Sequence, residues 1–139
     1  MEITATPLQT VEENQNILFT DTVICGNCSM VHRPGSGLVT LRGITRQCRA
    51  RFRVSFGANI AVPADGTVGP ISVAIAIDGE PVASTEMIVT PAATEEFNNV
   101  FGSVFLNVPA GCCSQVSVRN TSTGPIDVQN ANLIIERVA

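Results

Sequence analysis

The stretch Ile71-Ser-Val-Ala-Ile-Ala-Ile-Asp-Gly79 decides the fold class. Its odd-numbered positions carry Ile or Val up to residue 77, and its even-numbered positions carry Ser, Ala or Asp. This alternation of period two is typical of a β-strand. The strand ends on Asp78-Gly79, a pair that tolerates the positive φ angles of a tight hairpin. We therefore expect a strand over residues 71–78 and a second, antiparallel strand directly after it.

The rest of the chain repeats this pattern of short strands and turns. No long segment has apolar residues at the i, i+3, i+4, i+7 spacing of an amphipathic helix. Turn sequences such as Pro34-Gly-Ser-Gly37 and Pro109-Ala-Gly111 separate the apolar runs. The strands we expect are residues 16–24, 38–42, 47–56, 71–78, 82–90, 97–108, 115–120 and 126–137. About eight strands in a chain of this length predict an all-β, two-sheet sandwich or jelly roll.

Length and composition predict one folded domain. The chain has 139 residues, of which 45% are hydrophobic and 14% are charged. A disordered chain has the opposite composition, so disorder is excluded. We place a jelly-roll domain at residues 15–139 and an N-terminal arm or extra strand at residues 1–14. The longest apolar run, residues 71–77, is far shorter than the ~20 residues of a membrane helix, and no secretory signal is visible.

The charged and aromatic residues narrow the choice of partners. The net charge is −4, and all eight cationic side chains are arginines. This acidic balance argues against general affinity for nucleic acid, which depends on a basic surface. The chain contains no Trp or Tyr, the residues on which sugar rings commonly stack, so a glycan is a less favoured ligand. The surplus of apolar residues favours a partner of another kind, a second subunit.

The strand expected over residues 97–108 has two apolar faces. One face carries Phe97, Phe101 and Phe105, and the other carries Val100, Val104, Leu106 and Val108. A strand in a single sandwich alternates between core and solvent, so the second apolar face needs a cover. The cover is either an arm or loop of the same chain or a second subunit, and we expect the subunit. Ala74 and Ala76, on the small, flat face of their strand, are assigned to the same interface.

Several segments carry a family resemblance. The run Val108-Pro-Ala-Gly-Cys-Cys-Ser-Gln-Val-Ser-Val-Arg-Asn-Thr-Ser122 resembles a strand-turn-strand unit of bacterial and phage domains in the tumour-necrosis-factor/complement-globular-head superfamily. The run Val128-Gln-Asn-Ala-Asn-Leu-Ile-Ile-Glu-Arg-Val138 resembles the last strand of those domains. Other matching segments, in the family's usual order, are residues 16–20, 31–41, 51–56 and the hairpin at 75–82. The resemblance covers residues 15–139.

This resemblance implies a jelly roll that assembles as a homotrimer around aromatic and aliphatic side chains. The sequence contains no collagen-like Gly-X-Y stalk. Short, stalkless domains of this kind resemble auxiliary proteins that decorate the capsid or fibre of phage and prophage particles. We therefore expect a structural protein on a virion surface, assembled in the bacterial cytoplasm, with a capsid or other particle protein as its partner. The alternative is a trimeric adhesin that binds a receptor or a glycan.

The five cysteines leave several possibilities open. Cys25-Gly-Asn-Cys28, together with His32 and Cys48, has the residue types of a zinc site, but the last two candidate ligands are single residues at uneven distances. Cys112 and Cys113 are neighbours, which point to opposite faces of a strand. Disulfides within or between subunits, with Cys112 or Cys113 meeting across a three-fold axis, are another possibility, and buried or idle thiols are the third. We expect no metal and no cofactor.

The arginines are concentrated in one part of the sequence. Arg42, Arg46, Arg49, Arg51 and Arg53 lie within a dozen residues. In an extended strand the last three share one face at roughly 7 Å spacing. One interpretation is a solvated face paired with carboxylates such as Glu86, Glu95 and Glu96. The other is a docking stripe for an acidic protein surface, which the planar guanidinium group suits.

The sequence gives little support for catalysis. His32 is the only histidine, and no recognisable Ser or Cys nucleophile motif accompanies it. A single His in a turn before Pro34 is more often a surface or capping residue than a base. Neither Glu12-Glu13 nor Glu95-Glu96 forms a paired acid and base, because neighbours on a strand diverge. We therefore expect no enzymatic activity.

Overall fold

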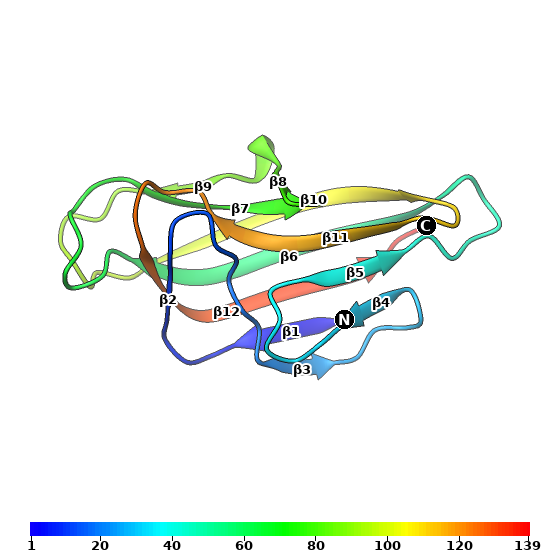
Figure 1. Ribbon diagram of the computed structural model, residues 1–139, viewed down its shortest axis with the longest axis horizontal. Coiled ribbons are helices and arrows are strands. Elements are labelled where there is room, and N and C mark those ends of the chain that lie inside the picture. Colours follow the sequence, from blue (N-terminus) through cyan, green and yellow to red (C-terminus); the bar gives the residue numbers. More distant parts are fainter.

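Two antiparallel sheets lie face to face in the computed structural model, which describes all 139 residues (Figure 1). Sheet A has the strand order β10-β6-β12-β1-β3, with β2 paired to β12. Sheet B has the order β4-β5-β11-β7-β8, with β9 paired to β7. The strands are β1 (Glu2–Ala5), β2 (Gln9–Val11), β3 (Asp21–Ile24), β4 (Met30–His32), β5 (Val39–Arg42), β6 (Arg49–Ala61), β7 (Ile71–Ile77), β8 (Glu80–Pro81), β9 (Met87–Val89), β10 (Asn98–Pro109), β11 (Cys113–Asn120) and β12 (Ile126–Arg137).

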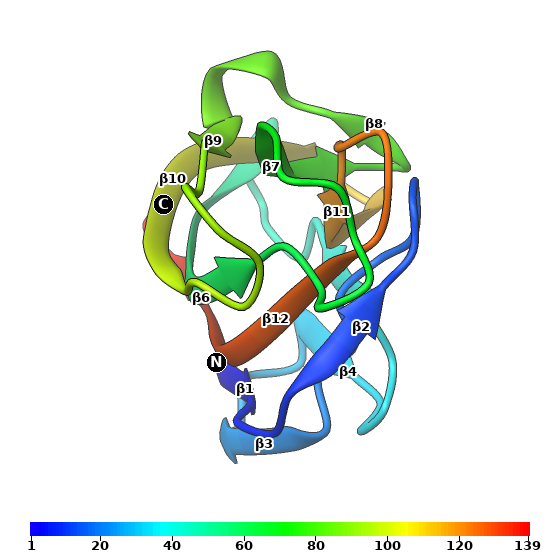
Figure 2. The same cartoon turned by 90° about the vertical axis from the view of Figure 1, so that its left-hand side faces the viewer.

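The all-β jelly roll predicted from the sequence is confirmed. Inward-facing side chains of both sheets form one core. Figure 2 shows the strands from one end of the sandwich. In the first half of β6 the buried apolar side chains are those of Ala50, Phe52, Val54 and Phe56, and the first three of them alternate with arginines. The ring of Phe56 meets Phe19 edge to face at 6.4 Å. The only helix is the short 3-10 helix η1 (Ala83–Thr85), and no helix is long and apolar enough to cross a membrane.

The hairpin predicted at Asp78-Gly79 joins β7 to β8. Both residues have positive φ angles, 53° and 85°. The Asp78 carboxylate also accepts a hydrogen bond from the main-chain N–H of Gln115 at 2.9 Å. This contact ties the turn to β11, so the tight turn that the sequence indicates is also held by its neighbour.

The strand expected over residues 82–90 is wrong in its first half. The Thr85 hydroxyl accepts the N–H of Ile75 at 3.0 Å, in the place of a main-chain partner. It donates to the carbonyl of Val82 at 2.8 Å. The Thr85 side chain thus takes the place of a main-chain hydrogen-bond partner of β7. Residues 83–85 form the 3-10 helix η1, and the next strand, β9, begins only at Met87.

Residues 1–14, expected as an arm or an extra strand, belong to the sandwich. They supply β1, which lies between β12 and β3, and β2, which pairs with β12. Ile3 and Ala5 are buried in the core. The Met1 amino group donates to the carbonyl of Ile135 at 2.8 Å. The strand expected over 16–24 is therefore shorter, because β3 alone pairs with β1 while residues 14–17 bond to β11.

Candidate subunit interface

The outward surface of sheet A carries an uncovered apolar patch. The exposed fractions of Phe101, Phe105, Ile134 and Phe97 are 68%, 62%, 41% and 39%. Phe101 and Phe105 lie on β10, and Ile134 lies on β12, the strand on the other side of β6. The opposite face of β10 packs Val100, Leu106 and Val108 into the core. The two apolar faces predicted for this strand are thus confirmed, and one of them has no cover within the chain.

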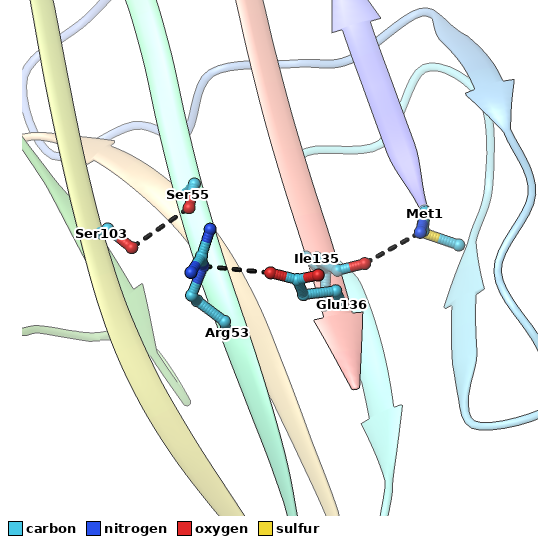
Figure 3. Close-up of polar contacts among 6 residues, drawn as sticks. All are labelled: Met1, Arg53, Ser55, Ser103, Ile135 and Glu136. Carbon is cyan, nitrogen blue, oxygen red and sulfur yellow. Dashed lines mark hydrogen bonds and ion pairs between the residues drawn. The ribbon is translucent and has the colours of Figure 1, made fainter. Parts of the chain in front are cut away.

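Small and paired polar groups separate the aromatic rings on this patch. Ser55 of β6 and Ser103 of β10 hydrogen-bond through their hydroxyls at 3.1 Å (Figure 3). One step along the sheet, the Arg53 guanidinium group meets the Glu136 carboxylate at 3.1 Å. Gly57 pairs with Phe101 and adds no side chain of its own. Between the exposed rings, a second surface would therefore meet small side chains and one balanced ion pair.

The arginine stripe lies on the same sheet face as the patch. Arg49, Arg51 and Arg53 occupy the outward side of β6, and Arg53 is the cross-strand partner of Phe105. Arg53 is paired with a carboxylate of a neighbouring strand, as the first interpretation expects, but within the chain that carboxylate belongs to Glu136 and not to Glu86, Glu95 or Glu96. The stripe also divides: Arg42 lies on β5 in sheet B, and Arg46 lies in the connection that follows it.

Ala74 and Ala76 offer no surface to a second subunit. Their exposed fractions are 1% and 0% within the single chain. Both faces of β7 are covered, and Arg119 of β11 lies opposite Ala74 in the sheet. Its guanidinium group extends to the neighbourhood of Gly79. The small side chains do allow a close neighbour, as expected, but that neighbour is part of the same chain. The prediction that Ala74 and Ala76 lie at the subunit interface is therefore wrong.

The zinc candidates do not assemble. No group of three or more His, Cys, Asp or Glu side chains is close enough to hold a metal ion. The ring nitrogens of His32 are 3.1 Å from the Thr22 hydroxyl and 3.0 Å from the carbonyl of Ser36. His32 therefore links the edge strands of the two sheets, which is a structural role.

All five cysteines are exposed and unpaired within the chain, so of the possibilities left open by the sequence the buried thiols and the disulfides within one subunit are absent, while idle thiols and disulfides between subunits stay open. Cys25 and Cys28 lie between β3 and β4, Cys48 lies just before β6, and Cys112 and Cys113 lie at the turn from β10 to β11. These three connections are at the same end of the sandwich, on the right in Figure 1. We call it the thiol-bearing end.

Two hollows lie at opposite ends of the molecule. The larger, about 390 Å³, lies between residues 62–71 and 122–125 and has mainly polar and Gly or Pro walls, including Asp65 and Thr67. The smaller, about 260 Å³, lies at the thiol-bearing end and is bordered by Gln47, Cys48, Arg49, Arg51 and Ala139. Neither hollow is bordered by Phe101 or Phe105, although the smaller one shares Arg51 with the outward face of sheet A. The candidate interface is therefore a surface and not a cleft.

Solved structures share this arrangement of strands. The globular domain of a zebrafish complement 1qA protein superposes with a TM-score of 0.64 at 14% identity, over 96% of this chain and 93% of that one. An Eiger TNF from S. frugiperda gives 0.67 at 13% identity, over 100% and 92%. Murine APRIL gives 0.62 at 7% identity, over 97% of both chains.

The fold is a jelly roll of the tumour-necrosis-factor/C1q type. No protein-family model and no curated protein sequence matches the chain. At these identities the likeness concerns the fold alone, and function has to be argued from the surfaces of this TNF/C1q-like jelly roll.

The sequence did not lead us to Ile134, Ser55 or Glu136 as parts of the patch. A signal for Ile134 is present in Leu133-Ile134-Ile135, where three consecutive apolar residues must expose one of them on a strand. The Ser55–Ser103 and Arg53–Glu136 pairs depend on which strands become neighbours. Nothing in the local sequence fixes those neighbours.

Proposed function

We propose that this protein is a non-enzymatic, homotrimeric structural module and that the outward face of sheet A is its subunit interface. The observation that carries the proposal is the exposure of Phe101 and Phe105 on a face with no cover within the chain. Large apolar side chains grouped on a surface commonly mark an interaction site. A trimer is the assembly that the TNF/C1q-like fold favours.

A second copy is a better cover for this face than a segment of the same chain. Residues 1–14 are the only segment that the sequence offered as a free arm, and they are bound into sheet A as β1 and β2. The Arg53–Glu136 pair balances the charge directly opposite Phe105, while Arg51, the next outward residue of β6, keeps its charge and hydrogen-bonds to Asn107. Each Phe buried at the interface contributes about 1.5–3 kcal/mol.

The second part of the proposal names the surface to which the trimer binds. We propose a bacteriophage or prophage particle, at the capsid surface or a fibre, with assembly in the bacterial cytoplasm. The support is the resemblance of residues 108–122 and 128–138 to phage and bacterial domains of this fold. Arg42, Arg46 and Arg49, near one end of the sandwich, supply a basic surface for an acidic particle protein.

The trimer is tested by changing the two most exposed aromatic residues. We expect Phe101→Ser with Phe105→Ser to run as a monomer in size-exclusion chromatography with light scattering, where the unchanged protein runs as a trimer. Ile88→Ser is the matched control, because Ile88 is as exposed as these residues but lies on β9 of the other sheet. An intact trimer from the double variant would refute this interface.

The mounting surface is tested by sedimentation. We expect the purified trimer to pellet with phage particles that lack it and not with host cell-wall glycan. Pelleting with the glycan alone would replace the structural role by that of an adhesin. In that case the polar hollow between residues 62–71 and 122–125 is the first place to look for the sugar.

A further inference from the structure

Strand β10, at one side of sheet A, has an open edge. It pairs with β6 along one side only, over 12 residues and with no break in register. In an edge strand, every second residue directs its main-chain N–H and C=O groups away from the sheet. Outside the ladder with β6, residues 98–108 make no hydrogen bond between main-chain groups. The free side of β10 therefore offers a row of donors and acceptors to a further strand.

This edge lacks the features by which proteins protect an edge strand, namely short length, charged side chains, proline and bulges. The other edge strands have them: β3, β4 and β9 have three or four residues each, and β8 consists of Glu80 and Pro81. By contrast, β10 carries no charged side chain, and its one proline, Pro109, is its last residue. A long, uncharged and apolar edge strand is a template for pairing with another chain.

The outward side chains of β10 read the same in both directions. From residue 99 to residue 107 they are Asn99, Phe101, Ser103, Phe105 and Asn107. An antiparallel copy of the strand, laid along the open edge with a two-fold axis at Ser103, therefore sets ring opposite ring and amide opposite amide. Side chains that lie directly opposite each other in an antiparallel pair interact, and aromatic pairs are among the favourable ones. The outward face of β10 is thus complementary to itself.

The inward side chains fit the same register. Val100 lies opposite Leu106 in it, and Gly102 lies opposite Val104, so both of these pairs are apolar. Gly102 and Val104 are only partly buried in the single chain, and a second strand at the edge would cover them further. Because β10 carries no charge, two copies of it also meet without repulsion between like charges on the strand.

We propose that the open edge of β10 binds a second copy of this chain, which adds its own β10 as an antiparallel strand centred on Ser103. The contact is isologous, since the same residues of both copies meet across a two-fold axis. It joins the two copies of sheet A into one continuous sheet. The inference goes beyond the trimer, which uses the outward face of sheet A and a three-fold axis. Phe101 and Phe105 take part in both contacts, so pairing and trimer formation compete for the same chain.

Single cysteines test the register, in the full-length chain with its five native cysteines, all exposed, changed to serine. On mild oxidation Ser103→Cys should form a covalent dimer, because opposite Cβ atoms are roughly 4.5–5.5 Å apart. Phe101→Cys or Phe105→Cys alone should form little dimer, since like residues are then roughly 14 Å apart along the strand. When these two variants are mixed, the dimer that links position 101 to position 105 should form about tenfold faster than either variant links to itself, because a disulfide requires close Cβ atoms. Non-reducing gels and mass spectrometry of the linked peptides measure these rates.

Gln115→Cys, at an exposed residue of β11 in the other sheet, gives the rate of chance collisions. If Ser103→Cys and the mixed variants link only at that rate, the proposal is overturned. Links of position 101 to 101 and of 105 to 105 would also overturn it, because a three-fold axis brings each residue to its own copies, and this pattern would leave the trimer intact. The trimer is judged separately, by light scattering of the unchanged protein. Thermal unfolding of each variant checks that the fold is kept.

Discussion

At the scale of single residues, Asn120 holds together the loops opposite the thiol-bearing end. Its side chain is fully buried, and its amide N–H groups donate to the carbonyls of Val11, Glu12 and Gly124 at 3.0, 3.2 and 2.9 Å. Its side-chain oxygen accepts the N–H of Ser122 at 2.9 Å. Four main-chain groups from two segments therefore depend on one side chain.

We expect Asn120→Ala to lower the free energy of unfolding by about 2–4 kcal/mol, because it leaves several buried main-chain groups without a partner. Urea unfolding followed by circular dichroism measures this loss. Gln115→Ala is the control, since Gln115 is exposed on the same strand and should change stability by less than about 0.5 kcal/mol. Equal effects of the two substitutions would mean that the Asn120 contacts contribute little.

Gly43 is a second residue whose role follows from its surroundings. A Cβ at this position would overlap the carbonyl group of Pro109. The N–H of Gly43 donates to Cys112, and its carbonyl accepts from Gly111 at 3.0 Å, so the main chain cannot easily move away. We expect Gly43→Ala to cost about 1–3 kcal/mol in thermal or urea unfolding. Gly69→Ala, at a position with open space around it, should have almost no effect, and a similar cost there would contradict the steric explanation.

At the scale of elements, β1 is a structural strand and not an appendage. It lies inside sheet A, with Ile3 fully buried. We expect Ile3→Ala to cost about 2–5 kcal/mol, as for other large-to-small substitutions in a core. Deletion of residues 1–5 should abolish cooperative unfolding, because it exposes β12 along one edge. Ile88→Ala, at an exposed residue, is the control and should change the free energy of unfolding little. A cooperative unfolding transition in the truncated chain would mean that residues 1–5 are an arm that the sandwich does not need.

The elements also show which parts of the fold local sequence can predict. The expected ranges match β7 and β12 within one residue of their ends; β7 alternates along its whole length, and β12 does so apart from a register shift between Gln129 and Asn132 and the apolar run at 133–135. The same rule failed at residues 82–85, where the Thr85 hydroxyl takes a ladder position of Ile75. It missed β4, and it gave β1 and β2 only as an arm or an extra strand, because these strands have three or four residues each and β1 and β2 pair with β12, far along the chain.

At the scale of the whole molecule, the candidate site needed the topology as well as the sequence. The parity of residues 97–108 predicted an uncovered apolar face on its own, and the structure has that face. The local sequence could not predict that the arginines of β6 lie on this same face, because that prediction depends on the pairing of β6 with β10. For the same reason the sequence placed Ala74 and Ala76 at an interface, whereas β11 and its Arg119 lie beside them.

A trimer held by this face makes thermal stability depend on protein concentration. Assembly stabilises the folded chain by mass action, so the unfolding midpoint of the unchanged protein should rise with concentration. The Phe101→Ser, Phe105→Ser variant should show one midpoint at all concentrations, because both side chains are exposed in the single chain and their loss leaves its core intact. Differential scanning calorimetry over a hundredfold concentration range distinguishes the two cases. If the unfolding midpoint of the unchanged protein does not depend on concentration, the protein is not a trimer. If the midpoint of the variant does depend on concentration, the subunit interface lies on another face.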